Sequence, residues 1–157
     1  RRLLSEEPPE ECRSCAKAGW YHPPELEDWI EVGVNDSFGT QLGAGWGAGS
    51  DGIRWSRKGA LLRLRNSHKP RLRIELVSSP DADSPLEQRG EIAVNGIPVG
   101  RFRLDGIVPT PLIFDLPGLE GPELLVRIEC EQEHLVAASN GDLWRLGVGL
   151  RRAELVS

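Results

Sequence analysis

The chain has 157 residues, a length that suits one domain with its own hydrophobic core. Apolar residues make up 39% and charged residues 27%, as in an ordinary soluble globular protein, and no apolar run approaches the ~20 residues of a membrane-spanning helix. The net charge of -5 argues against a nucleic-acid partner, because a phosphate backbone requires a basic surface.

Residues 1–27 differ from the remainder of the chain. They are acidic, lack strand alternation and contain two Pro-Pro pairs (8–9 and 23–24) that prevent a long helix. We interpret them as a linker or the tail of a preceding domain, and residues 28–157 as one β-sandwich domain. The chain contains no methionine and shows no signal-peptide pattern, so we expect a piece of a longer, cytoplasmic protein.

From Trp29 onward, apolar and polar residues alternate with the period of two that is typical of strands with one buried face. The clearest case is 71–79, where Leu72, Ile74 and Leu76 are expected to face inward. The expected strands occupy residues 29–34, 60–65, 71–79, 91–104 (a strand pair), 111–116, 123–131 and 144–156.

Two details refine this pattern. Asn95-Gly96 divides residues 91–104 and predicts a tight hairpin, because both residues tolerate positive φ. Cys130 is in phase with the apolar positions of its strand, so we expect a buried, inert thiol.

About seven to nine short strands without a crossover helix indicate antiparallel sheets that must cover one another. The predicted fold class is therefore all-β: an antiparallel β-sandwich of jelly-roll type.

The segment "LGAGWGAGSDGIRW", residues 42–55, contains Gly47, Gly49 and Gly52 at the Gly-x-Gly-x-x-Gly spacing of dinucleotide-binding loops. Such a loop needs a helix that opens at its last glycine and receives the phosphate at its N-terminus. Here a strand-like alternation follows instead. We predict no phosphate site, but a strand-connecting loop whose glycines present Trp46 either to a ligand or to the core.

Conventional catalytic patterns are missing from the sequence. The three histidines, His22, His68 and His134, do not have metal-ligand spacing, and no Gly-x-Ser-x-Gly elbow occurs. Cys12 and Cys15 form Cys-x-x-Cys, which is either half of a metal or cluster site or two exposed thiols. We expect no enzyme activity from this fragment.

The segment "LLSEEPPEECRSCAKAGWY", residues 3–21, resembles the C-terminal end of radical SAM enzymes with a SPASM-type auxiliary iron–sulfur domain. This resemblance implies that Cys12 and Cys15 ligate an iron–sulfur cluster in an intact parent protein. The remaining ligands are not in this sequence, so no cluster is expected in the fragment itself.

A second resemblance covers most of the chain. The stretches "DWIEVGVNDSFGTQLGAGWGAGSDGIRWSRKGALLRL", "VNGIPVGRFRL" and "GDLWRLGVGLRRAEL" are similar to small β-sandwich modules appended to bacterial glycosyltransferases and polysaccharide-assembly proteins. The matching positions are Gly33, Asp36, Leu42, Gly45-Trp46, Arg54-Trp55, Val94-Asn95-Gly96, Asp142 and Arg145-Leu146-Gly147-Val148.

This chain departs from that pattern at two places. Such modules usually carry a glutamate shortly after Gly-Trp, where this chain has Ser50-Asp51, and a proline after the penultimate strand, where it has "LVAAS". The resemblance implies a carbohydrate-binding-like jelly roll, and both departures concern the ligand more than the fold.

Sugar recognition combines flat apolar faces with polar groups for the hydroxyls. Trp46, Trp55 and Trp144 are the aromatic candidates, with core packing as the alternative for each. Turn formation alone also explains the aspartates, and a structural calcium ion is a further possibility for them. The polar ligand-binding candidates are Asp36, Asp51, Asp142, His134 and Arg145.

The leading functional hypothesis is a non-catalytic, carbohydrate-binding-like accessory domain of a larger bacterial enzyme of glycan or surface-polysaccharide chemistry. Its partner is then a weakly bound glycan or the parent enzyme's own catalytic domain. The alternative is a protein–protein docking or dimerisation module of a radical SAM enzyme. A standalone enzyme on the same sandwich is the third hypothesis.

Overall fold

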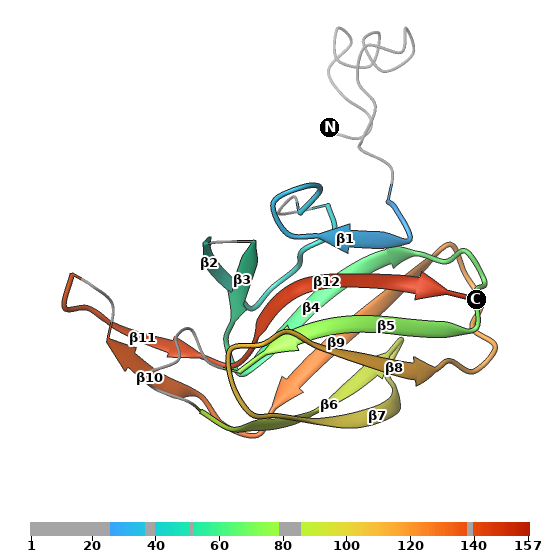
Figure 1. Cartoon of the computed structure of the whole chain (residues 1–157). Coiled ribbons are helices and arrows are strands. Elements are labelled where there is room, and N and C mark those ends of the chain that lie inside the picture. Colours follow the sequence, from blue (N-terminus) through green and yellow to red (C-terminus); the bar gives the residue numbers. More distant parts are fainter. Residues whose placement is uncertain (1–25, 37–39, 51, 79–85, 138–139) are drawn as a thin grey trace, which may run out of the picture.

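The computed structural model describes residues 26–36, 40–50, 52–78, 86–137 and 140–157, and within these ranges the chain forms strands and no helix (Figure 1). The strands are β1 (Trp29–Glu31), β2 (Trp46–Ser50), β3 (Ile53–Ser56), β4 (Gly59–Arg65), β5 (Arg71–Val77), β6 (Gln88–Val94), β7 (Ile97–Leu104), β8 (Thr110–Asp115), β9 (Glu123–Cys130), β10 (His134–Ala137), β11 (Leu143–Leu146) and β12 (Gly149–Val156).

Two antiparallel sheets form the sandwich. One has the order β2-β3-β12-β5-β8, with β1 also paired to β12, and the other has the order β4-β9-β6-β7. Successive strands cross repeatedly from one sheet to the other, and the orders β3-β12-β5-β8 and β4-β9-β6-β7 are those of a jelly roll. The predicted all-β, antiparallel jelly-roll sandwich is confirmed.

Strand β12 organises the first sheet because it is paired along both edges. On one edge it pairs with β5 over its whole length, from Gly149 to Val156. On the other edge β3 pairs with Gly149 and Leu150, and β1 pairs with residues 152–154. A register shift between Leu150 and Arg152 separates these two partners.

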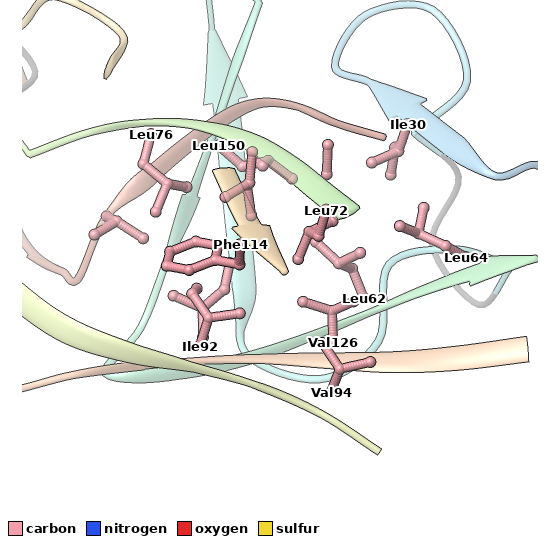
Figure 2. Close-up of a cluster of buried hydrophobic side chains, with 14 of the residues drawn as sticks. Ile30, Leu62, Leu64, Leu72, Leu76, Ile92, Val94, Phe114, Val126 and Leu150 are labelled. Carbon is pink, nitrogen blue, oxygen red and sulfur yellow. The ribbon is translucent and has the colours of Figure 1, made fainter. Parts of the chain in front are cut away.

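The core lies between the two sheets, where apolar side chains from each sheet meet (Figure 2). Leu72, Ile74 and Leu76 are fully buried, as their alternation predicts. Cys130 is 2% exposed, and burial raises the pKa of its thiol to about 12, which confirms the expected buried residue. Its thiol is therefore protonated at neutral pH, the unreactive form.

The predicted Asn95-Gly96 hairpin is also confirmed. Asn95 and Gly96 connect β6 to β7 with φ values of 51° and 83°, the left-handed pair that a two-residue hairpin requires. The Asn95 carboxamide oxygen further accepts a 2.7 Å hydrogen bond from the Leu125 N–H, which ties the turn to neighbouring β9.

Strand β1 is shorter than the predicted strand at residues 29–34. It ends at Glu31 because the chain turns there: the Asn35 N–H donates to the Glu31 carbonyl, and the Asn35 side chain accepts from the Glu31 N–H at 2.7 Å. Gly33 has a φ of 88°, which a strand does not allow, and Val34 is consequently 65% exposed rather than inward-facing.

The glycine-rich segment is a β-hairpin, which corrects the prediction of a loop. Gly47 and Gly49 lie within β2, and Gly52 forms the turn into β3 with a φ of 74°. Strands β3 and β4 follow Gly52 in place of a helix, as the alternation beyond this segment predicts. The strand pairing was missed because glycine contributes no side chain to an alternating pattern.

The expected single strand at 144–156 is divided at Gly147 into β11 and β12. The Gly147 N–H donates to the Ser56 carbonyl at 2.7 Å, and a Cβ at this position would overlap the Arg57 carbonyl. This close approach bends the chain, so that β11 leaves the sheet and pairs with β10 instead. The β10–β11 hairpin projects from one end of the sandwich, at the left of Figure 1.

Residues 1–25 lie outside the described residues, and with them Cys12 and Cys15. The tail, its cluster ligands and the boundary at residue 27 therefore remain predictions. Within the described ranges, no helix is long and apolar enough to cross a membrane.

Replacement of Gly147 by alanine is expected to lower the free energy of unfolding by about 2 kcal/mol, because the added methyl group overlaps the Arg57 carbonyl and lies 2.8 Å from Ser56 Oγ. Urea-induced unfolding measures the change. Gly106→Ala is the matched control, since no atom lies within 4 Å of its added Cβ. Equal stability of the two variants would contradict the close approach.

Candidate functional site

A cleft of about 420 Å³ lies where the β2–β3 hairpin faces β11. Its lining comes from Gly47 in β2, from residues 55–57 at the end of β3, and from residues 143–146, which make up β11. The lining thus combines segments about ninety residues apart in sequence, and the bend at Gly147 is what brings them together.

The floor of the cleft is a small hydrophobic cluster that is separate from the main core. Trp55 is 7% exposed and packs with Val77 and Leu146, while Val136 of β10 covers the cluster. Gly149 makes room for it, because a Cβ there would lie 2.8 Å from Val77 Cγ2. The cluster attaches the projecting hairpin to the sandwich.

Buried hydrogen bonds fix the floor to the start of β12. Ser56 is 1% exposed, and its hydroxyl donates to the Arg57 carbonyl at 2.7 Å and accepts from the Val148 N–H at 3.0 Å. Gln88 of β6 adds a 3.0 Å bond from Nε2 to the Gly147 carbonyl. Each buried polar group at this junction has a partner, which makes the junction rigid.

The wall of the cleft presents apolar side chains to solvent. In β11, Leu143 is 67% exposed and Trp144 is 44% exposed. Trp144 lies directly opposite Val136 of β10, and Arg145 opposite Leu135. Leu143 and Trp144 are consecutive strand residues, so their side chains leave both faces of the hairpin partly apolar and exposed to solvent.

Two arginines, Arg57 and Arg145, are the charged residues in the cleft lining. Arg57 is bound to Glu133 through Nε and Oε2 at 2.9 Å, and the Lys58 N–H also donates to that carboxylate at 2.8 Å. The hydrogen bonds from Arg57, foremost, hold the pKa of Glu133 below its ordinary value of 4.5, and the charge of Arg145 acts in the same direction. Glu133 therefore stays ionised at neutral pH.

Of the three candidate tryptophans, two are committed to packing. The Trp46 ring packs against the main core, and its Nε1 donates to the Leu61 carbonyl at 2.7 Å. Gly45 permits this, since it has a φ of 94° and its Cβ would collide with the Gly59 backbone. Trp55 is buried in the floor. Trp144, at 44% exposed, is the most exposed of the three.

Asp36 has a structural partner. Its carboxylate accepts from the Gly33 N–H at 2.8 Å and from Arg54 Nη2 at 2.6 Å. Burial alone would raise the pKa of Asp36, but the hydrogen bonds from Arg54 and Gly33 outweigh it and lower the pKa below 3.8. Both oxygens are occupied and a guanidinium lies beside them, so this carboxylate does not suit a calcium ion.

His134 and Asp142 are not among the residues that line the cleft. His134 in β10 makes a 2.9 Å hydrogen bond through Nε2 with the Glu87 carbonyl. Asp142 bonds with Asn140, at 3.0 Å, beside the end of the β10–β11 hairpin. Asp51 is outside the described residues. Among those described, no group of three or more His, Cys, Asp or Glu side chains could hold a metal ion.

The structure therefore brings together three of the predicted site residues, namely Trp55, Trp144 and Arg145. It adds Gly47 and Arg57, which sequence reasoning missed. Neither residue has a distinctive sequence pattern, because Gly47 lies in a glycine-rich segment and Arg57 is one of many arginines.

No family model matches the chain, and no curated protein matches it in sequence. Solved structures with a similar arrangement include an acetyl xylan esterase from the rumen bacterium Butyrivibrio proteoclasticus, at 14% identity and a TM-score of 0.46, with 83% of this chain and 32% of that chain covered. An exo-β-1,3-galactanase from Phanerochaete chrysosporium, in a structure with β-1,3-galactotriose, matches at 10% identity and 0.46, covering 84% and 29%.

The carbohydrate-binding module CBM36, in complex with calcium and xylotriose, matches at 11% identity and a TM-score of 0.42, with 82% of this chain and 98% of that chain covered. The chain thus spans about a third of each of the two enzymes and nearly the whole of this module. The fold assignment itself rests on the strand order described above.

The variant Asp36→Asn is expected to lower the free energy of unfolding by about 2 kcal/mol at pH 7, because the half-buried Arg54 loses its carboxylate partner. The pKa of Asp36 is lower in the folded chain than in the unfolded chain. As the pH falls, Asp36 is therefore protonated at a higher pH in the unfolded chain than in the folded chain. The wild type therefore loses this stabilisation from about pH 5 down through 3.8 and below.

Urea unfolding at a series of pH values measures this difference. The stability gap between wild type and Asp36→Asn should narrow as the pH falls, whereas the exposed Asp115→Asn control should show no gap of that kind. A gap that is constant with pH would show that the Arg54 pair does not stabilise the fold.

Proposed function

We propose that this chain is a non-catalytic, carbohydrate-binding-like accessory domain that binds a glycan in the cleft between the β2–β3 hairpin and β11. The observation that carries the proposal is Trp144, which is 44% exposed and lines a cleft of about 420 Å³. Binding sites for small ligands are concave and combine apolar surface with a few polar groups, and this cleft is lined by both apolar and polar residues.

The chemistry of a sugar ring suits these residues. The C–H face of a pyranose is apolar and can stack on the indole ring of Trp144, while hydroxyl groups need hydrogen-bond donors and acceptors. Arg57 supplies donors, and the small Gly47 leaves backbone groups of β2 accessible on the opposite side. The polar rim and the single aromatic platform are consistent with weak binding, on the order of millimolar.

The lining favours binding over catalysis. Among the described residues it contains no carboxylate and no histidine, the groups that most often transfer protons in enzymes. The neighbouring Glu133 is held ionised by Arg57, which is unsuitable for a general acid at neutral pH.

A docking module is the second candidate function, favoured by one observation. Leu135 is 60% exposed and Leu143 67% exposed, so the projecting hairpin carries apolar side chains beyond those needed for one sugar platform. Sedimentation of the chain, and of a longer protein that contains it, separates the two functions. A docking module changes the assembly state when Leu135 is replaced by aspartate, and a glycan-binding domain does not.

The glycan-binding proposal predicts that Trp144→Ala weakens binding by about tenfold or more, because the stacking surface is lost. Titration of a panel of oligosaccharides, followed by NMR of the indole N–H signals, measures the effect. Leu135→Ala is the matched control, since Leu135 is exposed on the same hairpin but does not line the cleft. The proposal fails if no oligosaccharide shifts the Trp144 signal, or if both variants weaken binding equally.

A further inference from the structure

The two faces of strand β11 have different surroundings. Side chains alternate between the faces of a strand, so Trp144 and Leu146 share one face and Arg145 lies on the other. Leu146 belongs to the small hydrophobic cluster with Trp55. Val136, which lies opposite Trp144 in β10, packs against the same cluster. The face that carries Trp144 is therefore the one turned toward β3, across the cleft.

The β2 side of the cleft contains a β-bulge. The register of β2 with β3 shifts between Trp46 and Gly49, so that residues 47–48 lie against the single residue Trp55. A bulge of this kind takes a residue out of the regular ladder, and bulges are common beside functional sites. Gly47, the first residue of the bulge, is the β2 residue that lines the cleft.

Gly47 is a glycine that the fold does not require. Among the described residues, a Cβ at this position would meet only the Trp55 carbonyl oxygen, at 3.6 Å, which is an ordinary van der Waals contact. The φ angle of Gly47 also lies outside the left-handed region that favours glycine. A glycine inside a strand weakens it, and such a glycine often marks a place where a ligand approaches the main chain closely.

The other glycines in and beside this hairpin each have a structural reason. Gly45 has a φ of 94°, and its Cβ would lie 2.0 Å from a backbone carbonyl oxygen. A Cβ at Gly49 would lie 2.7 Å from the Ile53 carbonyl oxygen, and Gly52 forms the turn with a φ of 74°. None of these three is in the described lining of the cleft. Of the four, Gly47 alone combines a place in that lining with no requirement from the fold.

We infer that Gly47 is a specificity-determining residue of the cleft, and that its missing side chain leaves room for a sugar ring between Trp144 and the main chain of β2. This inference rests on the proposed function and places its ligand: the ring enters the cleft instead of lying along the rim. The cleft of about 420 Å³ is at the small end of the range of roughly 300–1,000 Å³ for small-molecule sites, so one added side chain matters.

The test separates binding from folding. Cellotriose, mannotriose and laminaritriose are titrated into the 157-residue chain, and the indole N–H signals are followed by NMR. Gly47→Val is expected to weaken binding of the best of these trimers by about tenfold or more, because its side chain occupies the space of the ring. Gly47→Ala should weaken binding less than Gly47→Val, and it should not lower the urea midpoint of unfolding.

Gly49→Ala is the matched control, a glycine of the same strand that is not in the described lining. Its added methyl group lies 2.7 Å from the Ile53 carbonyl oxygen, so the urea midpoint should fall. The folded variant should bind the trimer as tightly as the wild type. The two alanine variants are thus expected to have opposite effects, with Gly47→Ala acting on binding and Gly49→Ala on stability.

The outcomes distinguish this inference from the proposed function. Wild-type affinity in both Gly47 variants, with Trp144→Ala still weakening binding, would overturn the inference and leave glycan binding in place. A urea midpoint that falls as far in Gly47→Ala as in Gly49→Ala would also overturn it, because Gly47 would then be a structural glycine. Binding of no trimer, and of no oligosaccharide in the wider panel, would overturn both.

Discussion

The contact between Gly147 and the end of β3 is the constraint on which the candidate site depends. The Gly147 N–H bonds to the Ser56 carbonyl, and the glycine passes so close to Arg57 that no side chain fits between them. This contact forces β11 out of the sheet that β12 then enters. Without it, residues 143–156 would continue as one strand, and Trp144 would not face the β2–β3 hairpin across a cleft.

The two hydrophobic clusters stabilise different parts of the molecule. The main core between the sheets holds the jelly roll together, with β12 paired on both edges as its organising strand. The smaller cluster of Trp55, Val77 and Leu146 attaches the hairpin that carries the exposed ring. Polar groups at the junction, above all the Ser56 hydroxyl, are paired and buried, so the hairpin is held in a defined position.

Most of the sandwich could be predicted from the sequence, and the site only in part. Alternation identified β4, β5 and β9 because their side chains contact the core every second residue, and Asn95-Gly96 identified its hairpin because few residues adopt two positive φ values. The β2–β3 hairpin was missed because its glycines have no side chains to alternate. Trp46, Trp55 and Trp144 are alike in sequence, and only the packing separates them. The pairing of Arg57 with Glu133, 76 residues away, has no local signal.

The separation of the two clusters has a consequence for how this domain can diverge in specificity. Residues 143–146, one part of the cleft lining, lie on a hairpin whose apolar support is a cluster separate from the main core. Substitutions at positions 143–145 alter the chemistry of the rim while the layers of Leu, Ile and Val beneath remain as they are. One scaffold can therefore present different recognition surfaces at little cost in folding stability, in the way that loops on a rigid framework do.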